Sequence, residues 1–156
     1  MKHFLAFTII TITLATAGIS CASPPPPATE PAAPPPVVSH GGPVTDYVSL
    51  FDNLRAAGAS VVPAGDISQP FFSVTGNAIT VDGENVQVFE YADNEEAEAQ
   101  AALVSPDGSS IGTTMASWIA PPHFYRAGKI IVLYVGDDTT LISVLESVMG
   151  PQFAGR

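Results

Sequence analysis

The sequence predicts an α+β domain: an antiparallel sheet of about five strands with helices packed on one of its faces, in a two-layer sandwich. Strand-like segments follow one another through short turns, which favours antiparallel pairing. Amphipathic helix patterns occur at the start, in the middle and at the end of the same region. Residues 44–156, 113 in all, suffice for a single domain that buries about two thirds of its surface.

The domain begins with a helix. Thr45 is a suitable N-cap with Asp46 in the first turn, and Gly58 ends the helix. Apolar side chains recur between them at helical spacing: Tyr47, Leu50, Phe51 and Leu54. A short strand over residues 59–62 follows and stops before Pro63.

The next segments predict a meander. Residues 82–85 read Asp-Gly-Glu-Asn, a sequence typical of a tight turn. Extended segments rich in Val, Phe and Ile lie on both sides of this turn. They cover residues 71–74, 77–81 and 86–91.

A second helix and a further strand come next. Asp93 and Glu96 have the spacing of a capping box, which predicts a helix that runs to about residue 104. Residues 105–108 read Ser-Pro-Asp-Gly and close it as a type I turn. Residues 113–120 are predicted to be a strand that two prolines interrupt.

The last part of the chain predicts a hairpin and a helix. Residues 123–126 and 129–135 flank an Ala-Gly turn, and the second of these segments is apolar enough for a central strand buried on both faces. Asp137 or Asp138 caps the final helix, which Gly150 ends.

The first residues have the layout of a secretory signal. Lys2 precedes an uncharged stretch over residues 4–19, which is short and rich in Thr for a membrane span. Its end resembles the lipobox of bacterial lipoproteins, in which a small residue precedes a cysteine that is diacylated and becomes the new N-terminus. Here Ser20 precedes Cys21, so residues 1–21 are predicted to be a signal peptide that leaves a lipidated Cys21. The alternative is ordinary cleavage after Ala22.

Residues 22–43 contain nine prolines and almost no large apolar side chains. Such a composition cannot form a core. It favours a polyproline-II spacer, with a rise of about 3.1 Å per residue and a full reach of roughly 60 to 70 Å. We therefore expect a Pro-rich linker between the anchor and the domain.

Composition excludes several classes of function. The chain has a formal net charge of −10, with fifteen acidic and five basic residues, which argues against binding to nucleic acid or to anionic lipid through a basic surface. Its single cysteine excludes an intramolecular disulfide and paired-thiolate metal sites. No loop for Ca²⁺, nucleotide or dinucleotide is present, so we expect no metal and no cofactor.

Residues 108–112 fit the G-x-S-x-G expression of a hydrolase nucleophile elbow. The elbow requires a strand before the serine and a helix after it, whereas here a helix precedes and a strand follows. The interpretation that fits this order is a glycine-rich turn without a catalytic residue. A small serine hydrolase that uses Ser109 or Ser110 with His123, the one histidine inside the domain, is the alternative.

The densest aromatic region forms a candidate interaction patch: Trp118, His123, Tyr125 and Arg126. The alternative is that these side chains alternate between the core and the outer face of the sheet. Strand geometry places His123 and Tyr125 on one face, which a two-layer sandwich would leave open to solvent. Phe124 should pack against a helix on the other face, and Arg126 should lie near the hairpin end.

Several segments together resemble a group of small bacterial lipoproteins. They read SPDGSSIGTT from residue 105, WIAPPHFYR from residue 118, VLYVGDD from residue 132 and GPQFAG from residue 150, with VQVFEY at residues 86–91. The resemblance covers about 110 residues. It implies export, lipidation and a single α+β domain, and it implies no catalytic residue.

The sequence therefore predicts an exported protein held at the extracytoplasmic face of a membrane by a lipid on Cys21. Its domain is expected to be a non-catalytic module that binds another envelope protein or a small ligand.

Overall fold

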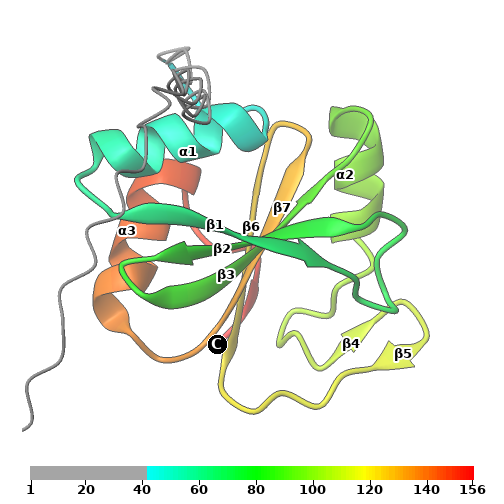
Figure 1. The fold of residues 1–156 in the computed structure, drawn as a ribbon. Coiled ribbons are helices and arrows are strands. Elements are labelled where there is room, and N and C mark those ends of the chain that lie inside the picture. The colour runs from blue at the N-terminus through cyan, green and yellow to red at the C-terminus, as the bar shows by residue number, and fades with distance from the viewer. Residues whose placement is uncertain (1–41) are drawn as a thin grey trace, which may run out of the picture. The chain divides into compact units, whose positions relative to one another are not determined.

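The structure, a computed structural model, describes residues 42–156. The predicted signal peptide, Cys21 and the Pro-rich linker up to residue 41 lie outside the described residues. The described part contains a six-stranded antiparallel sheet and three helices, so the predicted α+β class is confirmed (Figure 1).

Groups of consecutive strands separate the three helices of the described residues along the chain. The helices are α1 (Tyr47–Ala56), α2 (Asn94–Ala101) and α3 (Thr139–Met149). The strands of the main sheet are β1 (Val61–Ile67), β2 (Gly76–Val81), β3 (Glu84–Glu90), β6 (Pro122–Ala127), β7 (Ile130–Val135) and β8 (Ala154–Gly155). A separate small hairpin consists of β4 (Ser110–Ile111) and β5 (Thr114–Met115).

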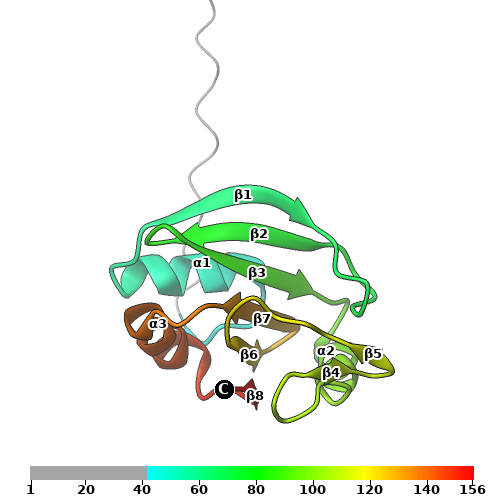
Figure 2. The same ribbon diagram turned by 90° about the horizontal axis from the view of Figure 1, so that it is seen from below.

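The main sheet has the order β1-β2-β3-β7-β6-β8, and every neighbouring pair is antiparallel. The predicted meander and the predicted hairpin are joined between β3 and β7, where Val88 pairs with Val132. The two-residue strand β8 pairs with β6 at one edge and has no counterpart in the sequence prediction. Figure 2 shows the curved strands β1 to β3 beside α1, and β6 and β7 beside α3.

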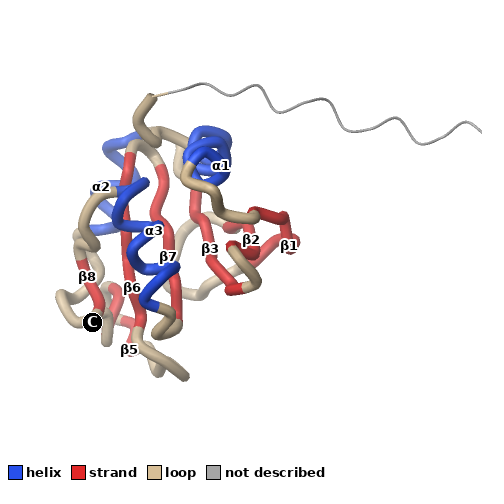
Figure 3. Tube along the Cα trace, turned by 90° about the vertical axis from the view of Figure 1, so that its left-hand side faces the viewer, coloured by secondary structure: helices blue, strands red, loops and turns tan. Residues whose placement is uncertain are grey.

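Helices cover both faces of the sheet, whereas the sequence predicts them on one face only. α1 and α3 lie on one side, and α2 lies on the other together with the β4–β5 hairpin (Figures 1 and 3). The reason is the apolar run of β7, in which Ile131 and Leu133 point away from α3 and are fully buried. The small side chains Ala97 and Ala101 form the buried face of α2 that packs in this second core.

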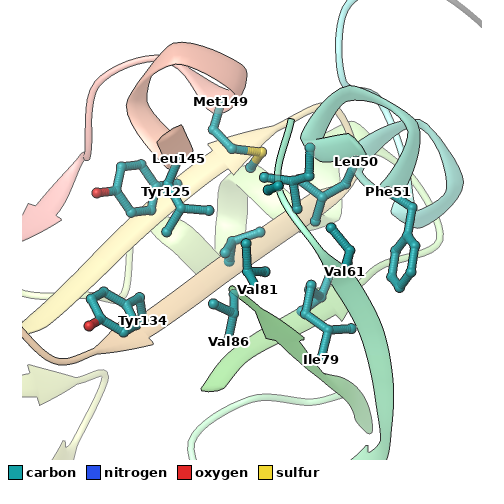
Figure 4. Close-up of a cluster of buried hydrophobic side chains, with 14 of the residues drawn as sticks. Leu50, Phe51, Val61, Ile79, Val81, Val86, Tyr125, Tyr134, Leu145 and Met149 are labelled. Carbon is teal, nitrogen blue, oxygen red and sulfur yellow. The ribbon is translucent and has the colours of Figure 1, made fainter. Parts of the chain in front are cut away.

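The larger core lies between the sheet and α1 with α3 (Figure 4). Leu50 and Leu54 of α1 and Leu145 of α3 are completely buried in it. Aliphatic side chains of β2 and β3 and two tyrosines of β6 and β7 complete this core: Ile79, Val81, Val86, Val88, Tyr125 and Tyr134.

Several boundaries differ from the sequence prediction. The N-cap of α1 is Asp46 and not Thr45, because the Asp46 carboxylate accepts the backbone N–H of Ser49 at 2.8 Å. Asp138 rather than Asp137 caps α3. β1 extends through residue 67, and residues 71–74 form a turn instead of a strand. Of the strand predicted over residues 113–120, only β5 forms.

Candidate functional site

The structure divides the predicted interaction patch between the two faces of the sheet. His123 and Tyr125 do share a face, as strand geometry requires, but that face is covered by α3 and both side chains are buried. The expectation that they are open to solvent is therefore wrong, since helices cover both faces. Phe124 is buried in the opposite core as predicted, and Arg126 lies near the β6–β7 turn, half-buried, 3.4 Å from the side chain of Asn94.

The imidazole of His123 uses both of its nitrogen atoms inside the protein. Nε2 donates to the carbonyl oxygen of Gly136 at 3.1 Å, because a carbonyl can only accept. Nδ1 lies 2.7 Å from the side-chain amide of Gln152. Neither nitrogen is left to take a proton from Ser109 or Ser110.

The hydroxyl of Tyr125 lies in the core without a hydrogen-bond partner among the described residues. Burial raises the pKa of this phenol to about 12, and the negative charge of Glu146 adds to the effect. Figure 4 shows the ring next to Leu145 of α3. Tyr125 is thus a core residue and cannot form part of an interaction surface.

The two serines of the G-x-S-x-G segment belong to a hydrogen-bonded turn. One oxygen of Asp107 accepts the N–H and the hydroxyl of Ser109, at 3.0 and 2.8 Å, and the hydroxyl of Ser105 at 2.9 Å. These bonds, led by the N–H of Ser109, lower the pKa of Asp107 to about 2. The backbone N–H of Ser110 donates to Ser105. The segment therefore forms the glycine-rich turn that its order of helix and strand indicates.

Trp118 is the member of the predicted patch that faces a cavity. Its indole Nε1 donates to the carbonyl oxygen of Gly108 at 2.7 Å, so the polar edge of the ring is used by the same turn. The ring also packs edge-on against Phe71 and Phe124, with centroids 5.8 and 5.9 Å apart. The surface that half-buried Trp118 offers to a ligand is therefore aromatic carbon and not a hydrogen-bond donor.

A cleft of about 390 Å³ opens beside Trp118, and we name it the Trp118 cleft. It lies between the β1–β2 loop and the segment that begins with β5, which Figures 1 and 2 show side by side. Its lining residues come from both of these segments and from β3 and β7: Gln69, Pro70, Phe71, Gln87, Thr114, Met115, Ala116, Ser117, Trp118, Ile119 and Val135.

None of the residues that line the Trp118 cleft is charged. The amide of Gln69 donates to the amide oxygen of Gln87 at 2.9 Å, which leaves one amide oxygen and one amide nitrogen for a ligand. Met115 and Ile119 stand at the rim with 78% and 100% of their surface exposed. The cleft can therefore bind a neutral ligand through aromatic and aliphatic contacts and a few neutral hydrogen bonds.

Trp118 also lines a second hollow of about 360 Å³. It includes Asp107, Ser109 and Arg156, and prolines form part of its wall. One oxygen of the Asp107 carboxylate already accepts three hydrogen bonds, from Ser105 and Ser109. These bonds within the turn at residues 105–110 therefore hold the polar side of this hollow in place.

The sequence prediction included Trp118 but missed the cleft, because the other side of its lining comes from segments distant in the chain: Gln69, Pro70, Phe71, Gln87 and Val135. One signal was available: residues 108–125 contain no Asp, Glu, Lys or Arg in a strongly acidic chain.

Within residues 42–156, no group of three or more His, Cys, Asp or Glu side chains is placed to hold a metal ion. The same residues include no helix that is long and apolar enough to cross a membrane. Comparisons of the chain with protein-family models, with curated proteins and with solved structures find no match.

Proposed function

We propose that this chain is an exported protein, anchored in a membrane by a lipid on Cys21, whose domain is a non-catalytic module that binds another envelope protein or a small ligand. The binding site is the Trp118 cleft. The proposal replaces the predicted patch of four residues with a site built around one of them.

The observation that supports this function is an uncharged cleft with a bare apolar rim on an otherwise acidic chain. A large aliphatic side chain gains roughly 1.5 to 3 kcal/mol when it is removed from water. Ile119 is fully exposed and contributes none of this to the fold. Contact with a partner would recover it, and Trp118 beside it supplies the rigid aromatic surface that is common at the centre of interfaces.

A catalytic function has less support. The histidine that a serine hydrolase would need is buried and hydrogen-bonded to Gln152 and Gly136. The Ser109 hydroxyl donates a hydrogen bond to the Asp107 carboxylate, and His123 forms its hydrogen bonds elsewhere.

The binding function can be tested by photo-crosslinking in living bacteria that produce the full chain. Met115→p-benzoylphenylalanine places the reactive group at the rim of the cleft, and Val62→p-benzoylphenylalanine places it on β1, where Val62 is also an exposed apolar residue (53%). We expect discrete adducts from position 115 and none from position 62. Equal adducts at both positions, or none at position 115, would refute the cleft as a binding site.

The anchoring part of the proposal is tested separately by fractionation of cells that produce the full chain or its Cys21→Ser variant. We expect the wild-type chain with the membranes and the variant in the soluble exported fraction. If the variant stays with the membranes at the wild-type level, the lipid on Cys21 is not the anchor.

A further inference from the structure

The main chain beside the Trp118 cleft is free to pair with a ligand. From Ser117 to Ala120, no backbone N–H or C=O forms a hydrogen bond with the described part of the protein. The bonds resume on either side, where the N–H of Ala116 donates to Ser109 and the carbonyl of Pro121 accepts from Gly136. Three of residues 117–120, namely Ser117, Trp118 and Ile119, line the cleft, so unpaired peptide groups lie along one of its walls.

Unpaired peptide groups next to a strand are the feature that β-strand addition uses. The segment continues directly from β5, whose only strand partner within residues 42–156 is β4. Across the cleft, the free amide oxygen of Gln69 and the free amide nitrogen of Gln87 provide one acceptor and one donor. This combination matches the alternating N–H and C=O groups of an extended peptide.

The side chains indicate the character of that peptide. The cleft carries no charge that could neutralise a charged side chain, and the chain as a whole is strongly acidic. A buried charge without a partner is costly, so charged side chains are disfavoured within the cleft. Trp118, Met115 and Ile119 offer apolar contact to the side chains of an extended segment.

The same backbone argues against a lipid surface as the occupant. Peptide groups that lack internal hydrogen bonds are not tolerated in the hydrocarbon region of a membrane. Contact with lipid would remove the exposed Ile119 side chain from water, which is favourable. The peptide groups of residues 117–120, however, would lose their water without gaining hydrogen bonds.

We propose that the Trp118 cleft binds an extended, uncharged peptide segment of a partner protein, which pairs its main chain with residues 117–119 and packs apolar side chains against Trp118, Met115 and Ile119. This inference rests on the proposed function and names the partner for the same site.

The test uses the full chain and the fluorescence of Trp118, which is the one tryptophan of the sequence. The probe is a terminally blocked hexapeptide that alternates apolar residues with Thr and Ser. A matched hexapeptide has the same side chains but N-methyl groups on alternate peptide nitrogens, so it cannot donate to the cleft. We expect a saturable change in emission with the first peptide and an affinity lower by about tenfold or more with the second, because two or more hydrogen bonds are lost.

Variants of the chain locate the binding. Ile119→Ser should weaken binding of the unmodified peptide by about tenfold, since it removes a large apolar contact. Val62→Ser, the matched control on β1, should leave the affinity unchanged.

The outcomes separate this inference from the proposed function. Equal binding of the N-methylated peptide would overturn main-chain pairing. A saturable emission change with chitotriose or phosphatidylcholine vesicles that Ile119→Ser abolishes would overturn a peptide as the occupant. Crosslinks at Met115 without peptide binding would defeat the inference alone. No crosslinks and no response to any probe would defeat the proposed function as well.

Discussion

The ring of His123 on β6 stacks on the ring of Tyr134 on β7, with centroids 5.9 Å apart and planes 21° from parallel. The two residues are direct partners in the antiparallel register. His123 also bonds Gln152, which lies after α3, and the carbonyl of Gly136, which lies before it. One buried imidazole therefore connects both ends of the last helix to the sheet.

We expect His123→Ala to lower the free energy of unfolding by about 2 to 4 kcal/mol, because it opens a cavity and leaves Gln152 and Gly136 without their partner. Chemical denaturation of the variant measures this loss. Ser68→Ala, at an exposed position, is the control and should change stability by less than about 0.5 kcal/mol. A variant as stable as the control would show that His123 is not a structural residue.

The buried phenols should respond in opposite ways to loss of the hydroxyl. Tyr125→Phe removes a hydroxyl that has no partner in the described protein, and we expect stability to rise by about 1 kcal/mol. Tyr134→Phe removes a hydroxyl that accepts the N–H of Asp138 at 3.1 Å, and stability should fall by about 1 kcal/mol. Denaturation midpoints at neutral pH compare the two. If Tyr125→Phe is the more destabilising variant, its hydroxyl has a bonding partner after all.

Alkaline pH should destabilise the domain. Burial raises the pKa of Tyr125 from 10.0 to about 12 and also raises that of Tyr91. The unfolded state therefore loses its phenolic protons first, and the stability due to the protonated form is complete below pH 10 and lost as pH rises towards 12. Denaturation at several pH values between these limits measures how steeply the free energy of unfolding falls with pH, which is the slope in question. Tyr125→Phe should make it shallower, and an unchanged slope would contradict the assignment.

The order of elements could be predicted from the sequence because each one is encoded locally. The capping residue and apolar spacing of α3, and the turn at Gly128 and Lys129 between β6 and β7, depend on neighbours within a few positions. The packing of α2 on the second face could not be predicted in this way. It depends on Ala97 and Ala101, whose small side chains produce hardly any helical hydrophobic pattern.

The candidate site was predictable only in part. Trp118 and the absence of charge around it are visible in the sequence, whereas the cleft exists because Phe71 of the β1–β2 loop and Gln87 of β3 approach it. The error at His123 and Tyr125 had a single cause. Period-two alternation placed them correctly on one face, but it could not show that α3 covers that face.

A serine-directed fluorophosphonate probe should not label the purified full chain. Ser109 donates to a carboxylate of low pKa, and the one histidine of the domain bonds elsewhere. In-gel fluorescence after incubation measures labelling, with a known serine hydrolase as positive control. Labelling that disappears in Ser109→Ala or Ser110→Ala would revive the hydrolase alternative.

The turn at Asp107 should control the position of Trp118. The Asp107 carboxylate holds Ser105 and Ser109 on either side of Gly108, whose carbonyl accepts the indole N–H. We expect Asp107→Ala to release the ring, shift the emission of Trp118 to longer wavelength and weaken binding at the cleft. Asp137→Ala, an exposed carboxylate in another loop, is the control and should leave the emission unchanged.

The same turn should open in the wild-type chain at low pH. Hydrogen bonds lower the pKa of Asp107 from 3.8 to about 2. The stabilisation of the turn by the ionised carboxylate is therefore complete above pH 3.8 and is lost as pH falls through 2. The emission of Trp118 should move to longer wavelength over this interval in the wild type and stay constant in Asp107→Ala. If both proteins show the same shift in emission, a group other than Asp107 determines the position of the Trp118 ring.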